Sequence, residues 1–342
     1  MATSPLRAPD RPAAAVVLAG GRGTRLRPLT DNRPKPLVPF MGEPFVHGLL
    51  RRLADAGCDR VMLLVGQESA SWDATVAFGQ HIGVTVSVHT ESEPLDTAGA
   101  ARELFTRTPM RGPVLVCNGD ILTDVDLPAL VKAHCGAGAD ATLSLTRVHD
   151  TSAFGVVVCD DDGRVTDFIE KPPPGTTDVD TVNAGTYVLS PEVFGAFPGE
   201  GPLSFERVVF PGLVASGAVV LGVPSDAAWH DLGTPARYRA GHRTVLDGRC
   251  HWPSAPGLRI VATSVAVHET ATVDASADLA EGVVVGSMAR IGAGAVLRDC
   301  VLHDRAVVEP GARLTGVVMG AGATAAGVLD DAVLGDGERF PG

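Results

Sequence analysis

The sequence predicts an α/β domain built on a mostly parallel sheet, followed by a second domain that is a parallel β-helix. Two patterns carry this prediction. Short apolar runs alternate with helical patterns up to about residue 240, and from about residue 263 aliphatic residues recur with a period of six. The chain has 342 residues, 45% of them hydrophobic, which is enough for two cores. We expect the first domain at residues 11–245, a linker at 246–262 and the β-helix at 263–342.

The strands of the first domain are predicted from near-continuous apolar runs, because strands of a parallel sheet are buried on both faces. Such runs are "AAAVVLAG" at 13–20, "RVMLLVG" at 60–66 and "PVLVCNGD" at 113–120, and helices are expected at 45–57 and 98–105. Further strands are expected at 84–89, 141–148, 155–160, 165–170 and 182–190. Ligands of such sheets bind at the carboxyl ends of the strands, which is where "AGGRGTR" and "NGD" fall.

The second domain is predicted from a six-residue repeat of aliphatic positions, with glycine and other small residues between them. The period holds over six positions, slips by one residue at "RDCVL" and then resumes. The nine positions are Val267, Val273, Leu279, Val285, Ile291, Leu297, Leu302, Val308 and Leu314. The spacing is typical of a β-helix in which about three hexads form one coil, so about four coils are expected.

The composition excludes several classes of protein and partner. A net charge of −12 argues against non-specific nucleic-acid binding, although it leaves room for a local positive pocket that takes a small phosphorylated ligand. No apolar run approaches the ~20 residues of a membrane helix, and the N-terminus lacks the apolar core of a signal peptide. We therefore expect a soluble, cytoplasmic protein with no membrane partner. The six cysteines, at 58, 117, 135, 159, 250 and 300, form no CxxC pair and are expected to be reduced structural thiols.

The loop at residues 18–36, "LAGGRGTRLRPLTDNRPKP", is the strongest candidate for a binding site. It is neither a dinucleotide-binding loop nor a Walker A loop, because Leu26 stands where G-x-G-x-x-G needs its third glycine and no G-K-[ST] follows. Gly20, Gly21 and Gly23 permit positive φ and close backbone approach, so their amides can form a nest for an anion. Three prolines stiffen the segment and fix where its charges point. The basic residues of the loop are Arg22, Arg25, Arg27, Arg33 and Lys35.

Lysine usage singles out two positions. The chain holds 25 arginines but only three lysines, which is typical of a GC-rich genome that replaces lysine wherever the chemistry allows. Lys35 lies in "RPKP" and Lys171 in "IEKP", whereas Lys132 has no such context. Because a flat guanidinium does not replace a compact ammonium at a tight phosphate contact, Lys35 and Lys171 are candidate phosphate ligands.

The loop "GGRGTRLRPLTDNRPKPLVP" resembles the signature loop of the sugar nucleotidyltransferases, also called nucleotide-sugar pyrophosphorylases. The resemblance covers residues 13–240, because "EPLDTAGA", "CNGD", "FGVVVCDDDGRVTDFIEKP", "VNAGTYVLS" and "WHDLGTPARY" are similar to the family's later motifs in the same order. It implies a Rossmann-like sheet of the nucleotide-diphospho-sugar transferase fold. The repeat at 263–342 is similar to the left-handed hexapeptide β-helix of some members, and the layout is most similar to bacterial mannose-1-phosphate guanylyltransferases.

The resemblance implies that an NTP and a sugar 1-phosphate give an NDP-sugar and pyrophosphate, with GTP and mannose 1-phosphate as the favoured pair. The attacking phosphate is already an anion, so catalysis needs positioning and charge neutralisation, but no protein nucleophile or base. Mg²⁺ is the expected cofactor, because it binds through one or two carboxylates plus substrate. Asp120, after a strand, and Asp231, in "WHDLG", are the expected metal ligands. The alternative is that Asp231 caps the following helix.

The resemblance also implies roles for individual residues. Arg25 and the backbone of Gly20–Thr24 are assigned to the β- and γ-phosphates, Lys35 to the triphosphate as well, and Lys171 to the sugar phosphate. The expected nucleotide-binding residues are Leu18, Gly20, Gly21, Gly23, Thr24, Glu91, Asp96, Thr97 and Asn118. The expected sugar-phosphate-binding residues are Gly155, Glu170, Lys171, Asn183 and Thr186, with Glu170 and Asn183 as hydroxyl partners and Gly155 as a point of close backbone approach.

The base is predicted from Glu91. In related uridylyl- and thymidylyltransferases a glutamine stands five residues before a glycine that lies against the base, and the equivalent positions here are Glu91 and Asp96. An ionised glutamate only accepts hydrogen bonds, which matches the adjacent N1–H and N2–H donors of guanine, whereas adenine offers no such pair. Most relatives have glycine in place of Asp96, whose side chain would either obstruct the base or accept a hydrogen bond from guanine.

Several alternatives stay open. The same reaction with dTTP or ATP, or with glucose, heptose or cyclitol phosphate, is one, and a regulatory subunit that binds nucleotide-sugar without turnover is another. His268 and His303 are the only histidines of the repeat that could serve acyl transfer. About four coils favour a cap and an interface between subunits, so we expect a homo-oligomer formed through the β-helix.

Overall fold

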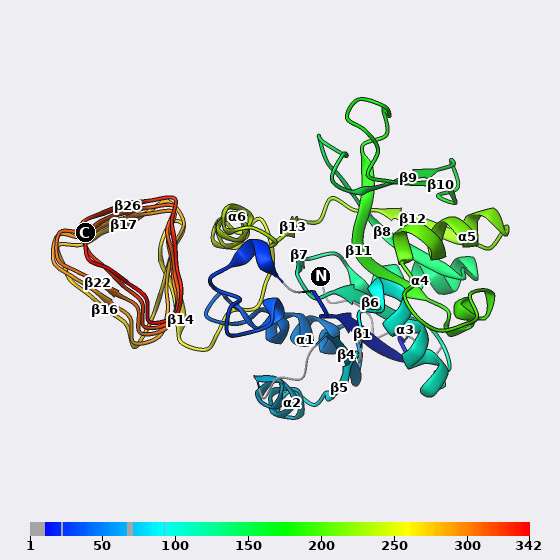
Figure 1. The fold of residues 1–342 in the computed structure, drawn as a ribbon, viewed down its shortest axis with the longest axis horizontal. Helices are drawn as coiled ribbons and strands as arrows, with labels where there is room; N and C mark the ends of the chain where they lie inside the picture. Colours follow the sequence, from blue (N-terminus) through cyan, green and yellow to red (C-terminus); the bar gives the residue numbers. More distant parts are fainter. Residues whose placement is uncertain (1–10, 22, 67–70, 92) are drawn as a thin grey trace. The chain divides into compact units, whose positions relative to one another are not determined.

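The computed structural model describes residues 11–21, 23–66, 71–91 and 93–342 (Figure 1). Its contacts divide the chain into two compact units. Unit 1 comprises Met1–Gly21, Leu50–Ile121 and Val125–Trp229, and unit 2 comprises Arg22–Leu49, Leu122–Asp124 and His230–Gly342. The glycine-rich loop is therefore divided between the two units.

A mixed sheet with a parallel centre forms the core of unit 1. Its main path runs β10-β9-β11-β6-β1-β4-β5, with β8 beside β11 and β12 beside β8. Strands β6, β1, β4 and β5 are parallel, whereas β11 is antiparallel to β6. The strands are β1 (Ala14–Leu18), β4 (Arg60–Val65), β5 (Thr85–Thr90), β6 (Val114–Asn118), β8 (Ala141–Arg147), β9 (Gly155–Cys159), β10 (Val165–Glu170), β11 (Thr181–Leu189) and β12 (Val220–Pro224). The expected α/β class is confirmed.

Helices cover this sheet, with α2 on β5, α4 on β8 and α5 on β10 (Figure 1). The inner strands β1 and β4 are buried along nearly their whole length, which is why their sequences are unbroken apolar runs. The helices are α1 (Phe45–Asp55), α2 (Ser71–His81), α3 (Asp96–Arg107), α4 (Leu127–Ala137), α5 (Phe210–Ala215), α6 (Pro235–Leu246), the 3₁₀ helices η2 (Thr24–Leu26), η3 (Lys35–Leu37) and η4 (Pro191–Ala196), and the π-helix η5 (Phe205–Val209). Helices α2 and α4 are not among the elements expected from the sequence.

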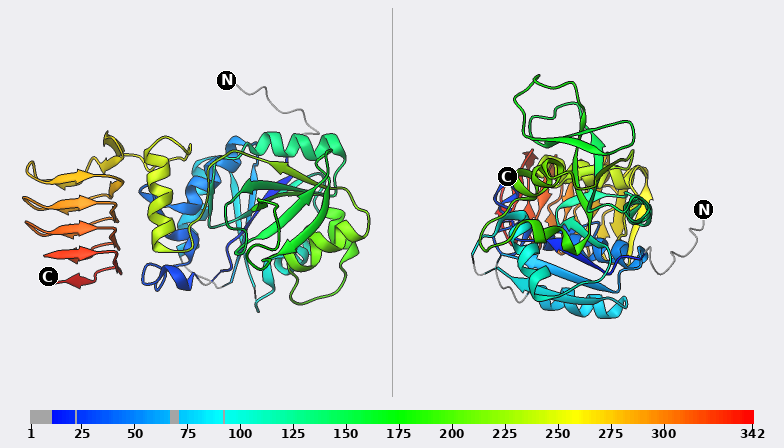
Figure 2. Two further views of the ribbon diagram at one scale, coloured as in Figure 1. Left: turned by 90° about the horizontal axis from the view of Figure 1, so that it is seen from above. Right: turned by 90° about the vertical axis from the view of Figure 1, so that its right-hand side faces the viewer.

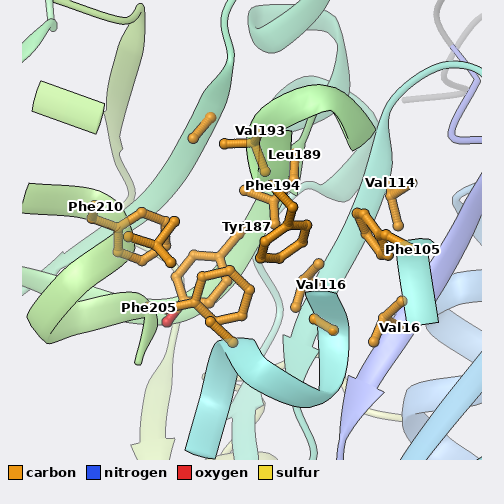
Figure 3. Close-up of a cluster of buried hydrophobic side chains, with 14 of the residues drawn as sticks. Val16, Phe105, Val114, Val116, Tyr187, Leu189, Val193, Phe194, Phe205 and Phe210 are labelled. Carbon is orange, nitrogen blue, oxygen red and sulfur yellow. The ribbon is translucent and has the colours of Figure 1, made fainter. Parts of the chain in front are cut away.

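An aromatic cluster fills the core of unit 1 beside β11 (Figure 3). The rings of Tyr187 and Phe210 have centroids 5.0 Å apart, and those of Phe205 and Phe210 are stacked at 5.4 Å. The hydroxyl of the fully buried Tyr187 accepts a hydrogen bond from Nδ2 of Asn183 at 2.7 Å. This bond satisfies the one polar atom that the ring carries into the core.

A parallel β-helix forms the C-terminal part of unit 2, and three short sheets are its three faces (Figures 1 and 2). Coils stack in register, with Val265 paired to Val283 and Val301 to Val318. The first face holds β14 (Leu258–Ala262), β15 (Val265–His268), β18 (Val283–Val285), β21 (Val301–Leu302), β24 (Val318–Met319) and β27 (Val333–Leu334). The second holds β16 (Thr272–Val273), β19 (Arg290–Ile291), β22 (Val307–Val308), β25 (Thr324–Ala325) and β28 (Arg339–Phe340). The third holds β17 (Asp278–Ala280), β20 (Val296–Arg298), β23 (Arg313–Thr315) and β26 (Val328–Asp330).

The six-residue period points into the interior of this β-helix. Val285, Ile291 and Leu297 are buried, and the three earlier positions of the period are partly buried against the same cluster. The one-residue slip of the period falls beside Asp299, which has φ +52°. The three positions after the slip, Leu302, Val308 and Leu314, are again buried. All nine positions of the predicted period therefore contribute to the interior of the β-helix.

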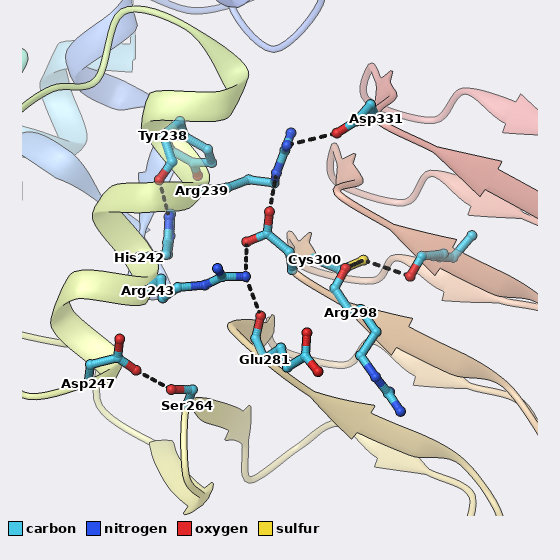
Figure 4. A network of polar contacts seen from close by, with 12 residues as sticks. Tyr238, Arg239, His242, Arg243, Asp247, Ser264, Glu281, Arg298, Cys300 and Asp331 are labelled. Atoms are coloured by element: carbon cyan, nitrogen blue, oxygen red, sulfur yellow. Dashed lines mark hydrogen bonds and ion pairs between the residues drawn. The ribbon is translucent and has the colours of Figure 1, made fainter.

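Helix α6 packs on the β-helix within unit 2 through polar side chains (Figure 4). Nε of Arg239 donates to Oδ2 of Asp299 at 2.9 Å, and Nη2 of Arg243 lies 3.1 Å from Oδ1 of the same carboxylate. Nε2 of His303 lies 3.0 Å from the hydroxyl of Tyr238, which itself donates to the carbonyl of Pro39. A tyrosine hydroxyl has one proton, and that of Tyr238 is used in the hydrogen bond to Pro39. Nε2 of His303 is therefore the donor in its hydrogen bond to Tyr238.

The remaining short strands are β2 (Pro39–Phe40), β3 (Glu43–Pro44), β7 (Ile121–Thr123) and β13 (Trp229–Asp231). Among the helices of the described ranges, none is long and apolar enough to cross a membrane.

Burial of two histidines makes the stability of unit 2 depend on pH. Burial lowers the pKa of His242 and of His303 to about 3, and in His303 the nearby Arg33 lowers it further. An unfolded histidine titrates near pH 6.5, so below that pH the unfolded chain binds protons that the folded chain excludes. The stability that each neutral histidine contributes is present above pH 6.5 and is lost as the pH falls toward 3.

We expect His303→Asn, which can still donate to Tyr238 but does not titrate, to flatten this dependence. Between pH 6 and 4 the wild-type free energy of unfolding should fall more steeply than that of the variant, by about 1.4 kcal/mol per pH unit. Urea titrations at several pH values measure both slopes. Parallel curves for the two proteins would mean that His303 titrates normally in the folded chain.

Candidate active site

The three glycines of the loop after β1 lie in different environments. Gly23 has φ +60°, and a Cβ added to it would lie 3.0 Å from Cβ of Lys35, so the backbone and the packing both require glycine. Gly20 has no positive φ, but a Cβ on it would lie 3.1 Å from Oε1 of Glu91. A Cβ on Gly21 would have no neighbour within 4 Å. Of the three, only Gly23 uses the left-handed conformation that the sequence led us to expect.

Three basic side chains converge on the carboxylate of Asp231 in unit 2. Nη1 of Arg237 donates to Oδ2 at 2.8 Å, Nζ of Lys35 lies 3.5 Å from Oδ1, and Nη2 of Arg25 lies 3.8 Å from Oδ2. The Lys35 side chain is 9% exposed and that of Arg25 is 65% exposed, so the lysine is held in place while the arginine faces solvent. The structure thus brings together Arg25, Lys35 and Asp231, which the sequence had singled out separately. Arg22 of the same loop lies outside the described residues.

Two further residues of "WHDLGTPARY" complete this cluster, and neither was expected from the sequence to belong to the site. Arg237 lies in the first turn of α6 and donates to Asp231. A Cβ on Gly233 would lie 2.7 Å from Nη2 of Arg25 and 2.8 Å from Oδ1 of Asp231, so glycine leaves the space in which they approach each other. The spacing in the sequence could have indicated this contact, because an arginine in the first turn of a helix can reach an aspartate six residues before it.

Thr234, not Asp231, caps helix α6. Its side chain accepts a hydrogen bond from the backbone N–H of Arg237 at 3.3 Å. The alternative interpretation of Asp231 as a helix cap is therefore wrong, because its carboxylate is turned to three cations instead.

Glu91 follows β5 and lies against the glycine loop within unit 1. Its Oε2 accepts a hydrogen bond from the N–H of Leu95 at 3.1 Å, and its Oε1 is the nearest atom to the missing side chain of Gly20. Burial raises the pKa of Glu91, and this effect outweighs the hydrogen bond from Leu95, which lowers it. A half-buried acceptor at the carboxyl end of a parallel strand is well placed to receive the donor edge of a ligand.

Asp96 occupies a conformation that glycine adopts more readily than other residues. Its φ is +61°, at the first residue of α3. Oδ1 accepts the N–H of Thr97 at 2.8 Å, and Oδ2 pairs with the guanidinium of Arg207. The hydroxyl of Thr97 in turn donates to Oε2 of Glu206 at 2.9 Å. Asp96, which stands where the resemblance implies glycine, therefore has its own charged partner in unit 1.

Leu18 and Asn118 end two neighbouring parallel strands, β1 and β6, side by side in register. A Cβ on Gly185, which has φ +73°, would lie 2.6 Å from Nδ2 of Asn118, so this glycine allows β11 to pass close to the end of β6. Asp120 follows two residues after Asn118, at the carboxyl end of the strand. Thr24, an exposed residue, begins the 3₁₀ helix η2 in unit 2.

The expected sugar-phosphate residues divide between open and enclosed positions. Gly155 pairs with Glu170 across β9 and β10, and a Cβ on it would lie 2.7 Å from the ring of Phe168 and 2.9 Å from Oε2 of Glu170. Glycine is needed there for packing, whatever else approaches it. Lys171 has φ +47°, its side chain is 63% exposed, and its ammonium lies 3.0 Å from Oε1 of Glu170. An exposed ammonium held by one carboxylate is available to an anion.

Asn183 and Thr186 lie in the interior of β11. Oδ1 of Asn183 accepts the N–H of Gly185 at 3.0 Å while its Nδ2 binds the hydroxyl of Tyr187. Thr186 is buried, and its side chain is hydrogen-bonded to Cys117 on β6. In this structure Asn183 therefore bridges the irregular stretch of β11 between Asn183 and Tyr187, and Thr186 links β11 to β6.

Asp120 and Asp231 offer carboxylate oxygens, the ligand type that Mg²⁺ prefers. Within the described residues, no group of three or more His, Cys, Asp or Glu side chains could hold a metal ion by itself. Because Mg²⁺ usually binds through one or two carboxylates and completes its shell with water and phosphate, the donor chemistry fits an ion that arrives with the nucleotide. Such an ion would share Asp231 with its three basic partners.

The two histidines of the repeat show no arrangement for acyl transfer. His303 is buried against Tyr238, and Nε2 of His268 lies 3.1 Å from the carbonyl of Pro256 while its Nδ1 lies 2.8 Å from the hydroxyl of Thr270. Both rings are occupied by contacts within unit 2.

Comparison with known proteins identifies one family across most of the chain. The family described as Nucleotidyl transferase matches residues 14–248. A mannose-1-phosphate guanylyltransferase of Mycobacterium tuberculosis is 39% identical over 298 residues, which are 87% of this chain and 81% of the relative. A probable mannose-1-phosphate guanylyltransferase 3 of Oryza sativa is 34% identical over 308 residues, covering 88% and 82% of the two chains.

Solved structures resemble about two thirds of the chain. HddC from Yersinia pseudotuberculosis, crystallised in complex with GMP-PN, is 28% identical with a TM-score of 0.56, over 67% of this chain and 97% of its own. A putative glucose-1-phosphate thymidylyltransferase from Bacillus anthracis, at 22% identity, has a TM-score of 0.58 over 67% of this chain and 93% of its own. At that identity the second likeness is one of fold.

We expect Asp231→Asn to destabilise the ligand-free protein, because the enclosed ammonium of Lys35 loses a counter-charge. The free energy of unfolding should fall by about 1–3 kcal/mol. Asp180→Asn is the matched control, since it removes the exposed pair with Arg147, which should contribute less than about 1 kcal/mol. Urea titrations of the three proteins compare the effects, and equal losses in the two variants would show that Asp231 does not organise its basic neighbours.

Proposed function

The chain belongs to the nucleotidyl transferase family, and we propose that it converts GTP and mannose 1-phosphate into GDP-mannose and pyrophosphate. The two curated relatives, at 39% and 34% identity, carry that activity in their names and match more than four fifths of this chain. The structural observation behind the proposal is the convergence of Arg25, Lys35 and Arg237 on Asp231. Arg25 and Lys35 belong to the glycine-rich loop at residues 18–36.

The three cations serve to bind the triphosphate. A polyphosphate offers more negative charge than one carboxylate, so it can replace Asp231 as the partner of Arg25 and Lys35. Gly20, Gly21, Gly23 and Thr24 bring backbone amides to the same phosphates. In the reaction, an oxygen of mannose 1-phosphate attacks the α-phosphorus of GTP in line and pyrophosphate leaves, so the residues need only hold the two anions and reduce their repulsion.

Glu91 selects the base and Lys171 binds the sugar phosphate. The carboxylate of Glu91 accepts N1–H and N2–H of guanine, with Leu18, Thr97 and Asn118 around the nucleoside. The structure of HddC complexed with GMP-PN, which is 28% identical and covers 67% of this chain, supports this choice. Lys171 neutralises the incoming phosphate, and Glu170 and Asn183 bind the sugar hydroxyls. Gly155 on β9 and the buried Thr186 on β11 support these positions.

Magnesium is proposed as the cofactor. Asp120 and Asp231 would hold the ion, which supplies positive charge to the phosphate oxygens when it is bound. The protein's own part is to present these two carboxylates at the ends of β6 and β13.

The two-domain assignment supports further proposals. We assign catalysis to residues 11–245 and assembly of a homo-oligomer to the β-helix at 263–342, joined by 246–262. Ile260 and Val261, on the outermost strand β14, are 63% and 60% exposed, and apolar side chains on such a strand favour contact with another subunit. The six cysteines form no disulfide, which is compatible with a cytoplasmic enzyme. We propose small-molecule substrates and no nucleic-acid or membrane partner.

A pyrophosphate-release assay over a matrix of NTPs and sugar 1-phosphates, with Mg²⁺, tests the proposed function. GTP with mannose 1-phosphate should give the highest kcat/KM. A preference for dTTP or ATP, or for glucose, heptose or cyclitol phosphate, would contradict it, and no turnover with any pair would indicate a regulatory subunit.

We expect the KM for GTP to rise at acidic pH because of Glu91. Its raised pKa means that the carboxyl takes up a proton at a higher pH than an ordinary glutamate, and the protonated form no longer accepts both guanine donors. Glu91→Gln should show a higher KM that does not change over the same pH range. Glu93→Gln, at an exposed position two residues away, is the control and should keep the wild-type profile. A pH-dependent KM in Glu91→Gln would assign the titration to another group.

We expect Lys171→Ala to raise the KM for the sugar 1-phosphate by about tenfold or more, because a charge-assisted contact to phosphate is lost. The KM for GTP should change by less than about twofold. Lys132→Ala, which removes the exposed lysine of α4, should change neither value. Steady-state kinetics with each substrate varied in turn measure both constants, and equal increases for the two substrates would reject this role of Lys171.

A further inference from the structure

The start of α3, which carries the expected base-binding residues, is hydrogen-bonded to the segment Leu203–Arg207 of unit 1. The N–H of Leu203 donates to the carbonyl of Leu95 at 2.9 Å, and the carbonyl of Leu203 accepts the N–H of Ala98 at 2.8 Å. Two residues later, the N–H of Phe205 donates to the hydroxyl of Thr97 at 3.0 Å. Three hydrogen bonds thus connect residues 95–98, at the start of α3, to residues 203–205.

The segment is itself fixed by the core. Phe205 and Val209, at the two ends of the π-helix η5, are fully buried, and Phe205 stacks on Phe210 (Figure 3). Single π-helical turns are rare and occur frequently at functional sites. The core therefore holds Leu203–Arg207 as a rigid support for the loop that precedes α3.

Arg207, the last residue of the segment Leu203–Arg207, contacts Asp96, which stands where the resemblance implies glycine. Arg207 pairs with Asp96, whose carboxylate also accepts the N–H of Thr97. The side chain of Arg207 is 63% exposed and that of Asp96 is 29% exposed, so the pair lies at the surface of the loop, outside the core. One residue earlier, the N–H of Leu95 holds the carboxylate of Glu91.

We propose that Arg207 is a positioning residue of the nucleotide site: it holds Asp96 in the left-handed conformation and keeps that carboxylate away from the base, so that Leu95 can orient Glu91. The inference rests on the proposed function in one respect, the role of Glu91 in binding the base. It explains why the chain tolerates aspartate where relatives have glycine, because the Arg207 pair and the Thr97 N–H compensate for a backbone conformation that glycine adopts without strain.

A double-mutant cycle of Arg207→Ala and Asp96→Gly tests this inference. In Arg207→Ala the KM for GTP should rise about tenfold, equivalent to about 1.4 kcal/mol, while kcat and the KM for mannose 1-phosphate change by less than about twofold. In the Asp96→Gly background the same Arg207→Ala change should raise the KM for GTP by less than about twofold, because glycine needs no partner. Arg207→Lys should retain most of the wild-type affinity.

The matched control is Arg107→Ala, at the other end of α3. Arg107 pairs with Glu103, and its side chain is 76% exposed, so its loss should leave all three constants unchanged. Melting temperatures are measured for every variant, and Arg207→Gln, which keeps most of the side-chain length, replaces the alanine variant if that one unfolds. An unchanged KM for GTP in Arg207→Ala, or an equal loss with aspartate and with glycine at position 96, would overturn the proposal.

Failure of the inference and failure of the proposed function are distinguishable. If the substrate matrix shows that the wild type prefers another NTP, the proposed function fails, and the cycle is run with that nucleotide. The coupling between Arg207 and Asp96 is then still expected in the KM for the preferred NTP, and its absence would reject the positioning role on its own.

Discussion

The proposed phosphate site depends on the ion pairs that the carboxylate of Asp231 makes with three basic side chains. Arg25, Lys35 and Arg237 come from two segments more than 190 residues apart in the sequence, and without a common anion they would repel one another. Asp231 stabilises them in one place before a ligand arrives. Such a cluster is preorganised for the triphosphate that we propose as its ligand, because the free-energy cost of gathering the charges is met on folding and not on binding.

Helix α6 connects this cluster to the β-helix inside unit 2. Its first turn carries Arg237, which donates to Asp231. Tyr238, Arg239 and Arg243 of the same helix face the coils (Figure 4). There Tyr238 is hydrogen-bonded to His303, and the two arginines pair with Asp299. The C-terminal repeat is thus more than an appended cap. Its contacts fix the helix from which a cation of the cluster projects, so the ordered interior of the β-helix supports the site.

Much of the fold could be predicted from the sequence, because its signals are local and periodic. The buried strands β1, β4 and β6 are unbroken apolar runs, and the aliphatic period of six points into the β-helix at each of its nine positions. Helix α2 has a weak apolar pattern and was not predicted. Gly23 has a left-handed φ whereas Gly20 and Gly21 do not, and no local sequence pattern distinguishes the three glycines.

The residue types of the proposed site could be chosen from sequence motifs, whereas the contacts between these residues could not. Arg25, Lys35 and Asp231 were identified one at a time from motifs, but their convergence, and the part of Arg237 and Gly233 in it, follow from the folding of distant segments. Asp96 was identified as a departure from the family's motif, but its partner Arg207 lies 111 residues away and carries no sequence signal.

The proposed phosphate site can be observed in a crystal structure of the protein with a non-hydrolysable GTP analogue. We expect the phosphate chain to lie beside Gly20–Arg25, with its oxygens within about 4 Å of the Arg25 guanidinium and the Lys35 ammonium. A phosphate chain bound elsewhere, with Arg25 and Lys35 still turned to Asp231, would contradict it.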